Sequence, residues 1–189
     1  GDWETDIDTI GNRCAKYGIQ INTSHLPFFK YANRANIPED EYAYNQKYVY
    51  LSLDAAIRLG VKWTVVHMTS DPVAAYDYIR PLCEHSTPNG LGLAIENVPS
   101  ASIEALNAVV DRLKGEGYLV GVCYDTGHAN VLGLDQRDTI HMLGNRIEML
   151  HIHDNFGQAN PHVITWNDDA HILPFDGTVD FRKVARSLK

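Results

Sequence analysis

Residues 91–97 read LGLAIEN, and two stretches of the same kind lie on either side of them: VKWTVVH at 61–67 and LVGVCYD at 119–125. Each is a short run of apolar residues that ends in a polar side chain, as is typical of a strand buried on both faces. Similar runs occupy 19–23 (IQINT, which leads to Ser24 and His25) and 147–153 (IEMLHIH). The sequence therefore predicts five strands.

Helical patterns separate these strands, with apolar residues recurring at spacings of three and four. In one of them Tyr48, Leu51, Ala55 and Leu59 form the apolar face. Short apolar strands that alternate with helices predict a parallel sheet covered by helices, either an open doubly wound sheet or a (β/α)8 barrel. No GxGxxG or GxxxxGK[ST] follows a strand, which disfavours nucleotide-binding versions. The expected helices are 2–17, 38–59, 72–84, 102–114, 135–145 and about 178–188, and a long loop spans 155–177.

Composition narrows the class of protein. The 189 residues carry a net charge of −8 and are 44 % hydrophobic, which is ordinary for a globular domain and argues against a nucleic-acid partner. No run of about 18 apolar residues could cross a membrane, and the opening GDWETDIDTI has no signal-peptide pattern. Three widely spaced cysteines indicate a reducing compartment, so a cytoplasmic location is expected.

Every predicted strand ends in a potential metal ligand or proton carrier. Because the carboxyl ends of parallel strands share one edge of the sheet, these side chains are expected to form one site. Glu96 and Asp125 are the most informative, since a carboxylate that ends an apolar strand needs a partner to offset its desolvation. The full set is His25, His67, Glu96, Asp125, His128, His151, His153 and Asp154, to which the following loop adds Asp169 and His171.

The donors are imidazoles and carboxylates without a thiolate, a set that suits Zn²⁺, Mn²⁺, Co²⁺ or Fe²⁺, with Mg²⁺ kept as a further candidate. Gly127 is expected to let the chain turn sharply between Asp125 and His128. Cys123, inside a strand, is interpreted as a buried, inert thiol. The remaining histidines (His85, His141, His162) are assigned to surface or packing positions, and the tyrosines at 42, 44, 48 and 50 to helix packing.

The ordered motifs resemble the xylose isomerase-like (β/α)8 barrels, which include sugar epimerases, inosose dehydratase-like proteins and endonuclease IV-type DNA repair enzymes. The matching pieces span nearly the whole chain: SHLPF (24–28), VVHM (65–68), LAIENVP (93–99), YDTGHAN (124–130), LHIHDN (150–155) and DAHILPFDGTVDF (169–181). The resemblance implies that Glu96, Asp125 and His151 bind the metal. It implies catalytic roles for Glu96 and His128, and places His25, His67, His153, Asp169 and His171 at substrate or second-metal positions.

A complete barrel of this type needs eight strands and about 250 residues. The sequence predicts only five, so residues 1–189 are expected to form a single, partial TIM-barrel domain that lacks the first strand and the last two. In the resembled family the seventh strand supplies a second glutamate, which is both ligand and catalytic. No residue of this chain can match it.

The expected function is that of a metal-dependent sugar or polyol isomerase or epimerase, which moves a proton through an enediolate. Its partner would be a small sugar or polyol, without nucleic acid or membrane, and the protein could form a homo-oligomer. Three alternatives stay open: an endonuclease IV-like zinc phosphodiesterase, an inosose dehydratase-like lyase, and a barrel that binds sugar or metal without turnover.

Overall fold

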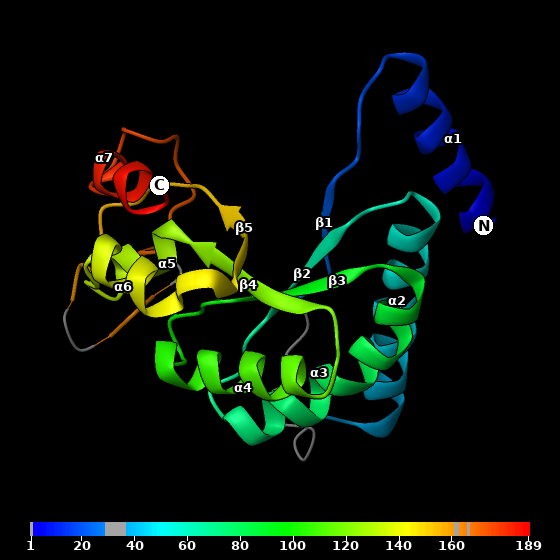
Figure 1. The fold of residues 1–189 in the computed structure, drawn as a ribbon, viewed down its shortest axis with the longest axis horizontal. Coiled ribbons are helices and arrows are strands. Elements are labelled where there is room, and N and C mark those ends of the chain that lie inside the picture. The colour runs from blue at the N-terminus through cyan, green and yellow to red at the C-terminus, as the bar shows by residue number, and fades with distance from the viewer. Residues whose placement is uncertain (1, 29–36, 161–162, 166) are drawn as a thin grey trace.

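The computed structural model describes residues 2–28, 37–160, 163–165 and 167–189. Five strands form one parallel sheet in sequential order, which curves into half of a barrel (Figure 1). This confirms the predicted fold class. The strands are β1 (Thr23–His25), β2 (Trp63–His67), β3 (Gly92–Glu96), β4 (Val120–Asp125) and β5 (Ile147–His151).

Three of the helices that connect the strands begin at side-chain caps, whereas the helix that follows Pro38 has none. Asp71, Ser102 and Asp135 each accept a hydrogen bond from a backbone N–H of the first turn that follows. No helix among the described residues is long and apolar enough to cross a membrane. The helices are α1 (Trp3–Lys16), α2 (Glu39–Arg58), α3 (Pro72–Ser86), α4 (Ile103–Gly115), α5 (Thr126–Val131), α6 (Gln136–Leu143) and α7 (Phe181–Ser187), with short 3-10 turns at Thr87–Asn89 and Gly144–Arg146.

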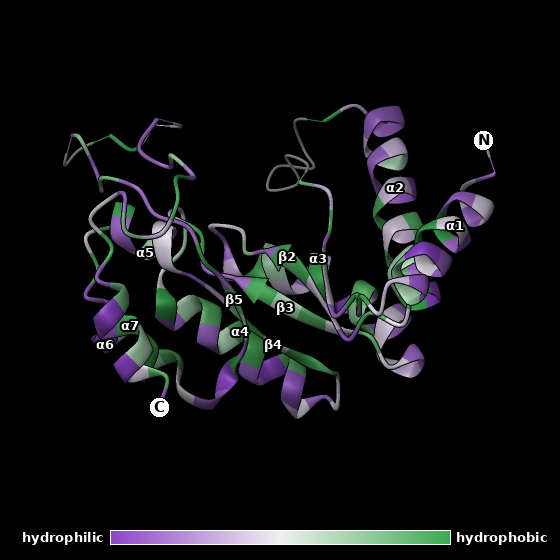
Figure 2. Ribbon diagram, turned by 90° about the horizontal axis from the view of Figure 1, so that it is seen from above, coloured by the Kyte–Doolittle hydropathy of each residue, from purple (hydrophilic) through white to green (hydrophobic). Residues whose placement is uncertain are grey.

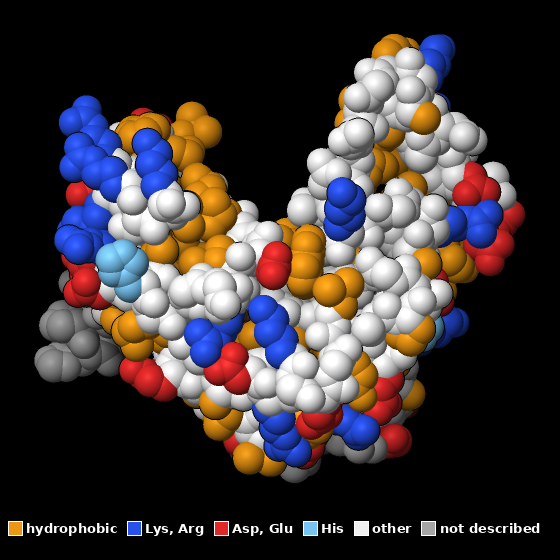
Figure 3. Space-filling view, in the orientation of Figure 1, with side chains coloured by type: hydrophobic (Ala, Val, Ile, Leu, Met, Phe, Trp, Pro, Cys, Tyr) orange, Lys and Arg blue, Asp and Glu red, His pale blue; other side chains and the backbone are white. Residues whose placement is uncertain are grey.

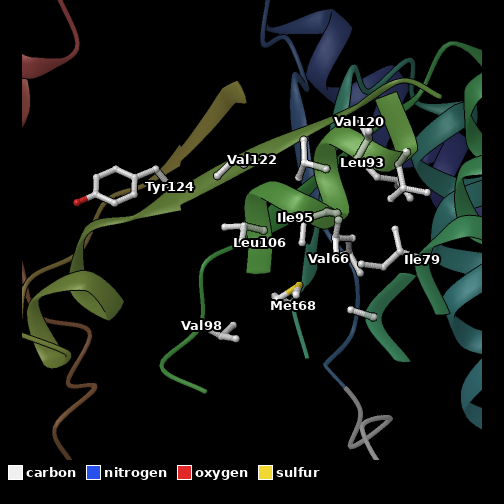
Figure 4. Close-up of a cluster of buried hydrophobic side chains, with 14 of the residues drawn as sticks. Val66, Met68, Ile79, Leu93, Ile95, Val98, Leu106, Val120, Val122 and Tyr124 are labelled. Carbon is white, nitrogen blue, oxygen red and sulfur yellow. The ribbon is translucent and has the colours of Figure 1, made fainter. Parts of the chain in front are cut away.

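The main core lies between the outer face of the sheet and the helices. Alternate residues of β2, β3 and β4, among them Val66, Ile95 and Val122, meet Ile79 of α3 and Leu106 of α4 (Figure 4). Hydrophobic and hydrophilic residues occupy different sides of α2 and α4 (Figure 2). This layer fixes the strands, and therefore the height of the side chains at their ends.

The inner face of the sheet is filled by a second, smaller cluster. Val65, Ala94 and Cys123 form it, with Trp63 packed below them. A Cβ on Gly92 would lie 2.3 Å from the Trp63 ring, so this glycine makes room for the indole. Because side chains alternate along a strand, the next inward positions above this cluster are the predicted site residues.

Two strands differ from the prediction. β1 begins at Thr23 and includes His25, whereas 19–22 form no strand. β5 ends at His151 because the chain then turns away, and Asp154 pairs instead with Ile172 in an isolated antiparallel bridge. Periodicity located both strands, but pairing with the neighbouring strand decided their ends.

Two helix faces also differ. The apolar face of α2 is displaced, since Val49, Leu53 and Ala56 are buried, not the predicted row that begins at Tyr48. No residue of α1 is buried, and Ile10 is 47 % exposed. Figure 3 shows the molecule hollowed between the part that carries α1 and the part that carries α7. A half-barrel leaves its edge helix without a second neighbour.

Candidate metal and catalytic site

Strand register places the predicted site residues side by side. The pairing of β2 with β3 sets His67 beside Glu96, and the pairing of β4 with β5 sets Asp125 beside His151. His25 ends the neighbouring β1. The carboxyl ends of the five strands therefore bring imidazoles and carboxylates to one edge of the sheet.

Glu96 and Asp125 form the centre of the cluster, and both side chains are fully buried. Nδ1 of His151 lies 2.7 Å from Oε1 of Glu96 and 2.9 Å from Oδ2 of Asp125. The side chains of the three residues predicted as metal ligands therefore converge at Nδ1 of His151. That site is the expected position for a cation.

A second set of donors extends from Glu96 toward β1. Nε2 of His67 lies 2.8 Å from Oε2 of Glu96, and Nε2 of His25 lies 3.1 Å from the same His67 nitrogen. The Phe28 ring packs against His67, with ring centroids 4.8 Å apart. Glu96 therefore faces His151 with one oxygen and the His25–His67 pair with the other.

A third set combines His153 with the loop that follows β5. Nε2 of His153 lies 3.0 Å from Oδ1 of Asp125 and 3.7 Å from Oδ1 of Asp169. The His153 and His171 rings stack with centroids 3.7 Å apart and an interplanar angle of 3°. Asp169 and His171 are thus brought from the loop to the strand ends.

His128 lies in the short helix α5, which sequence reasoning missed because it is only six residues long. Asp125 is its N-cap and accepts a hydrogen bond from the His128 backbone N–H at 2.7 Å. The ring Nδ1 donates to the Asn97 carbonyl at 2.8 Å, and Nε2 lies 3.4 Å from Oδ2 of Asp169. Both ring nitrogens have protein partners, so contact of His128 with substrate stays a prediction.

Gly127 has a role other than the predicted turn. It lies within α5 and has no positive φ. A Cβ at this position would lie 2.0 Å from Cε1 of His153. The DTGH motif therefore needs glycine because the imidazole of His153, which follows β5, lies directly against the helix backbone.

Carboxylates and imidazoles in the cluster stabilise each other's charged forms. Burial raises the pKa of Glu96, but the hydrogen bond from His151 and the proximity of His67 prevail and lower it to about 2. Hydrogen bonds to Asp125 and Glu96 raise the pKa of His151 to about 10. Burial lowers the pKa of His128, but Asp169 and Asp125 bring it up to about 9. Without a metal, imidazolium groups supply the positive charge that the carboxylates require.

The residues fit a divalent metal. Three groups of donors have ligand atoms within 4.8 Å of one another: His25, His67 and Glu96; Glu96, Asp125 and His128; and His153, Asp169 and His171. Among the described residues, Nδ1 of His153 and Oδ1 of Asp169 are buried without a hydrogen-bond partner, whereas Oε2 of Glu96 lies 2.8 Å from the His67 imidazole. Imidazole and carboxylate suit zinc and its neighbours, and burial raises the pKa of the nearby Cys123 thiol, which keeps it neutral.

Asn97 was not predicted, and Asp154, predicted as a potential metal ligand or proton carrier, instead binds backbone amides. The Asn97 side chain accepts from the Asp125 N–H at 2.7 Å and donates to the Asp125 carbonyl at 3.0 Å, as a further strand residue would. Asp154 is fully buried and binds the backbone of the loop that carries Asp169. For Asn97 the available signal was a polar residue directly after a strand, whereas the bonds of Asp154 to the loop depend on tertiary structure.

The residues assigned to other roles lie away from the cluster. His85 lies 2.7 Å from Asp54, and His141 is exposed on α6. His162 lies outside the described residues. Tyr44 and Tyr48 are exposed, so their assignment to packing was wrong, and their rings pair with each other instead (centroids 4.5 Å apart).

Comparison with known proteins places this geometry in a family. A curated relative, the uncharacterized protein y4fM of Sinorhizobium fredii, is 28 % identical over 151 residues, or 72 % of this chain and 46 % of its own length. A second, from Methanocaldococcus jannaschii, is uncharacterized and is covered over 61 % of its length. The chain therefore spans about half the length of the curated relatives that it matches.

Solved structures share the fold. A D-tagatose 3-epimerase-like protein has a TM-score of 0.78 and 21 % identity, over 97 % of this chain and 71 % of its own. The IolI protein, solved with a bound zinc atom, has a TM-score of 0.73 and 20 % identity, over 96 % of this chain and 67 % of its own. The pattern of one family matches residues 2–189. The chain belongs to the xylose isomerase-like TIM barrel family.

Proposed function

We propose that the full-length protein is a divalent-metal-dependent isomerase or epimerase of a small sugar or polyol, and that residues 1–189 supply part of a single barrel domain. One observation carries the proposal: two fully buried carboxylates, Glu96 and Asp125, meet at Nδ1 of His151. The epimerase-like and zinc-binding neighbours support the class of reaction and the metal. Location in the cytoplasm and self-association remain predictions.

Glu96, Asp125 and His151 would hold the metal. When bound, a divalent metal polarises a carbonyl and its adjacent hydroxyl and so stabilises an enediolate. Glu96 would remove the proton from the carbon beside the carbonyl and return it through Oε2, the carboxylate oxygen that faces His67 and His25 and not His151. The His25–His67 pair next to this oxygen would contact substrate hydroxyls.

His128 would orient the loop side of the site through Asp169, since its Nε2 lies 3.4 Å from that carboxylate. His153 and His171 would bind either substrate oxygens or a second metal. Their stacked rings and the unpartnered Nδ1 of His153 leave one nitrogen available in a buried position. The substrate thus would meet imidazoles on two sides of Glu96.

The three donor groups favour a second candidate, hydrolysis of a phosphoester at a multinuclear zinc site. Glu96 belongs to two of the groups and could therefore bridge two ions, an arrangement that suits phosphoester cleavage. The net charge of −8 opposes a nucleic-acid substrate, because phosphate backbones bind clustered Lys and Arg. The epimerase remains the first candidate.

The test uses the full-length protein, first freed of metal and then loaded with Zn²⁺, Mn²⁺ or Co²⁺. Incubation with a panel of ketoses in deuterated water should incorporate deuterium beside the carbonyl. Glu96→Gln should reduce this exchange about 10²- to 10⁴-fold, the usual range for a lost general base. Glu104→Gln, an exposed position in the first turn of α4, is the matched control and should leave the rate unchanged.

Absence of exchange with every sugar and metal would sink the first candidate, as would an unchanged rate in Glu96→Gln. Cleavage of bis(p-nitrophenyl) phosphate or of abasic duplex DNA without exchange would establish the second candidate. Loss of water from a cyclic polyol would indicate a lyase. Metal binding without any turnover would leave a binding module.

A further inference from the structure

A buried carboxylate beside the site has no role in the proposed reaction. Asp154 follows His153 and is fully buried, yet its carboxylate faces backbone amides. Oδ1 accepts from the N–H groups of Asn155 (2.9 Å) and Val179 (3.0 Å), and Oδ2 from those of Phe175 and Gly177 (both 3.0 Å). Four such bonds can stabilise a buried charge, because an ionised acceptor strengthens each of them.

We propose that Asp154 is a positioning residue that holds the loop of Asp169 and His171 against the strand ends. It thereby assembles the third donor group, which consists of His153, Asp169 and His171. The Asp154 clamp is defined as this carboxylate with the backbone N–H groups of Phe175, Gly177 and Val179. The inference rests on the proposed function for the use of that donor group. The clamp itself is a matter of local geometry.

Sequence adjacency links the clamp to the site. Asp154 and Ile172 form an antiparallel bridge, with both N–H···O distances at 3.0 Å. His153 and His171 are the residues directly before them in the sequence, and their rings stack beside this bridge. Fixing Asp154 on the loop therefore fixes His171 on His153.

The loop backbone is shaped around this carboxylate. Phe175 has a φ of 77°, in the left-handed region that a bulky residue rarely adopts, and its N–H donates to Asp154. A Cβ on Gly177 would lie 2.3 Å from the Asn155 carbonyl oxygen and 2.4 Å from Oδ1 of Asp154. The backbone of residues 174–179 (PFDGTV) therefore lies close to the Asp154 carboxylate, and only glycine at position 177 leaves room for this approach.

The clamp is also joined to α5. The Asn155 side chain donates to the Gly127 carbonyl at 2.9 Å, and Nδ2 of Asn130 donates to Oδ1 of Asn155 at 2.8 Å. Nδ2 of Asn130 also donates to Thr178 at 2.9 Å. The loop is therefore held from the strand and from the helix, and Asp154 makes the largest share of its backbone bonds.

The first experiment measures hydrogen exchange in the metal-free full-length protein. Asp154→Asn replaces one accepting oxygen with an NH₂ group that cannot accept, so the loop amides at 172–179 should exchange at least about 10-fold faster. Exchange in β2, β3 and β4 should not change. Asp176→Asn, exposed in the same loop, is the matched control and should exchange as the wild type does.

The second experiment counts bound Co²⁺ by mass spectrometry and absorption. Asp154→Asn should lose the ion held by His153, Asp169 and His171 and keep the ion that the proposed function assigns to Glu96, Asp125 and His151. Gly177→Ala would place a Cβ against the Asp154 carboxylate and so disturb the Asp154 clamp from the loop side. It should give the same result. It decides the question if Asp154→Asn does not fold.

Wild-type protection of the loop amides in both variants would overturn the clamp. Equal loss of all bound cobalt, or loss of none, would overturn its role in assembling the third donor group. If the wild-type protein binds no metal, the proposed function fails, but the exchange experiment still decides the clamp. The two failures are therefore distinguishable.

Discussion

The close contact of Gly127 with the His153 ring predicts that alanine at position 127 destabilises the protein. In Gly127→Ala the new Cβ would lie 2.0 Å from Cε1 and 2.4 Å from Nε2 of the imidazole. His153 is buried, stacks on His171 and hydrogen-bonds Asp125, so its ring cannot leave without loss. Alanine in place of a helical glycine otherwise stabilises a helix by about 1 kcal/mol.

The magnitude follows from three effects. Overpacking of a closed site costs about 1–3 kcal/mol, and loss of a hydrogen bond to a charged group costs about 1.5–3 kcal/mol. Against these stands the gain of about 1 kcal/mol in helix propensity. Gly127→Ala should therefore lower the free energy of unfolding by about 1.5–5 kcal/mol, measured by urea titration of the metal-free protein.

Two controls isolate the cause. Gly115→Ala, at the end of α4, meets no atom within 4 Å and should be neutral or stabilising by up to about 1 kcal/mol. In a His153→Ala background the clash is absent, so Gly127→Ala should behave like Gly115→Ala. The reasoning is refuted if Gly127→Ala is as stable as Gly115→Ala, or if it destabilises the His153→Ala protein as strongly as the wild type.

Three other predictions concern the rest of the molecule. Burial raises the pKa of Cys83 to about 12, so this thiol should react slowly with a maleimide at pH 8. The half-buried Cys14 should be labelled well before it, and equal labelling rates would contradict this prediction. Arg146 lowers the pKa of Asp111, so this pair stabilises the fold above the unfolded pKa of Asp111 and the effect is lost as pH falls through the folded value. Asp111→Asn should therefore reduce stability by less than about 1 kcal/mol at pH 7, and by nothing measurable at the acid end of a urea series. Zn²⁺ at about 1,000 times its Kd should stabilise the metal-free protein by about 4 kcal/mol in thermal unfolding, and a chelator should reverse the gain; an unchanged Tm would argue against a metal site.

Much of the fold could be predicted because it depends on near neighbours in the sequence. Runs such as 61–67 and 91–97 located the buried strands, and their alternation with helices gave the parallel sheet. The donors Glu96, Asp125 and His151 were found by the same reasoning, since each ends an apolar strand. Glu96, Asp125 and His151 lie together because parallel strands must end at a shared edge.

The sequence by itself therefore determined which elements form and which side chains reach the edge of the sheet. Tertiary structure decided what those side chains touch: that Gly127 serves His153, that Asp154 binds the loop at 175–179, and that β5 stops at His151. It also decided which side of α2 is buried, because the row that begins at Tyr48 and the row that begins at Val49 are both apolar, and only packing against the core selects the second. Periodicity is a property of residues a few positions apart, whereas these contacts join residues about 20 or more positions apart and depend on strand register and packing.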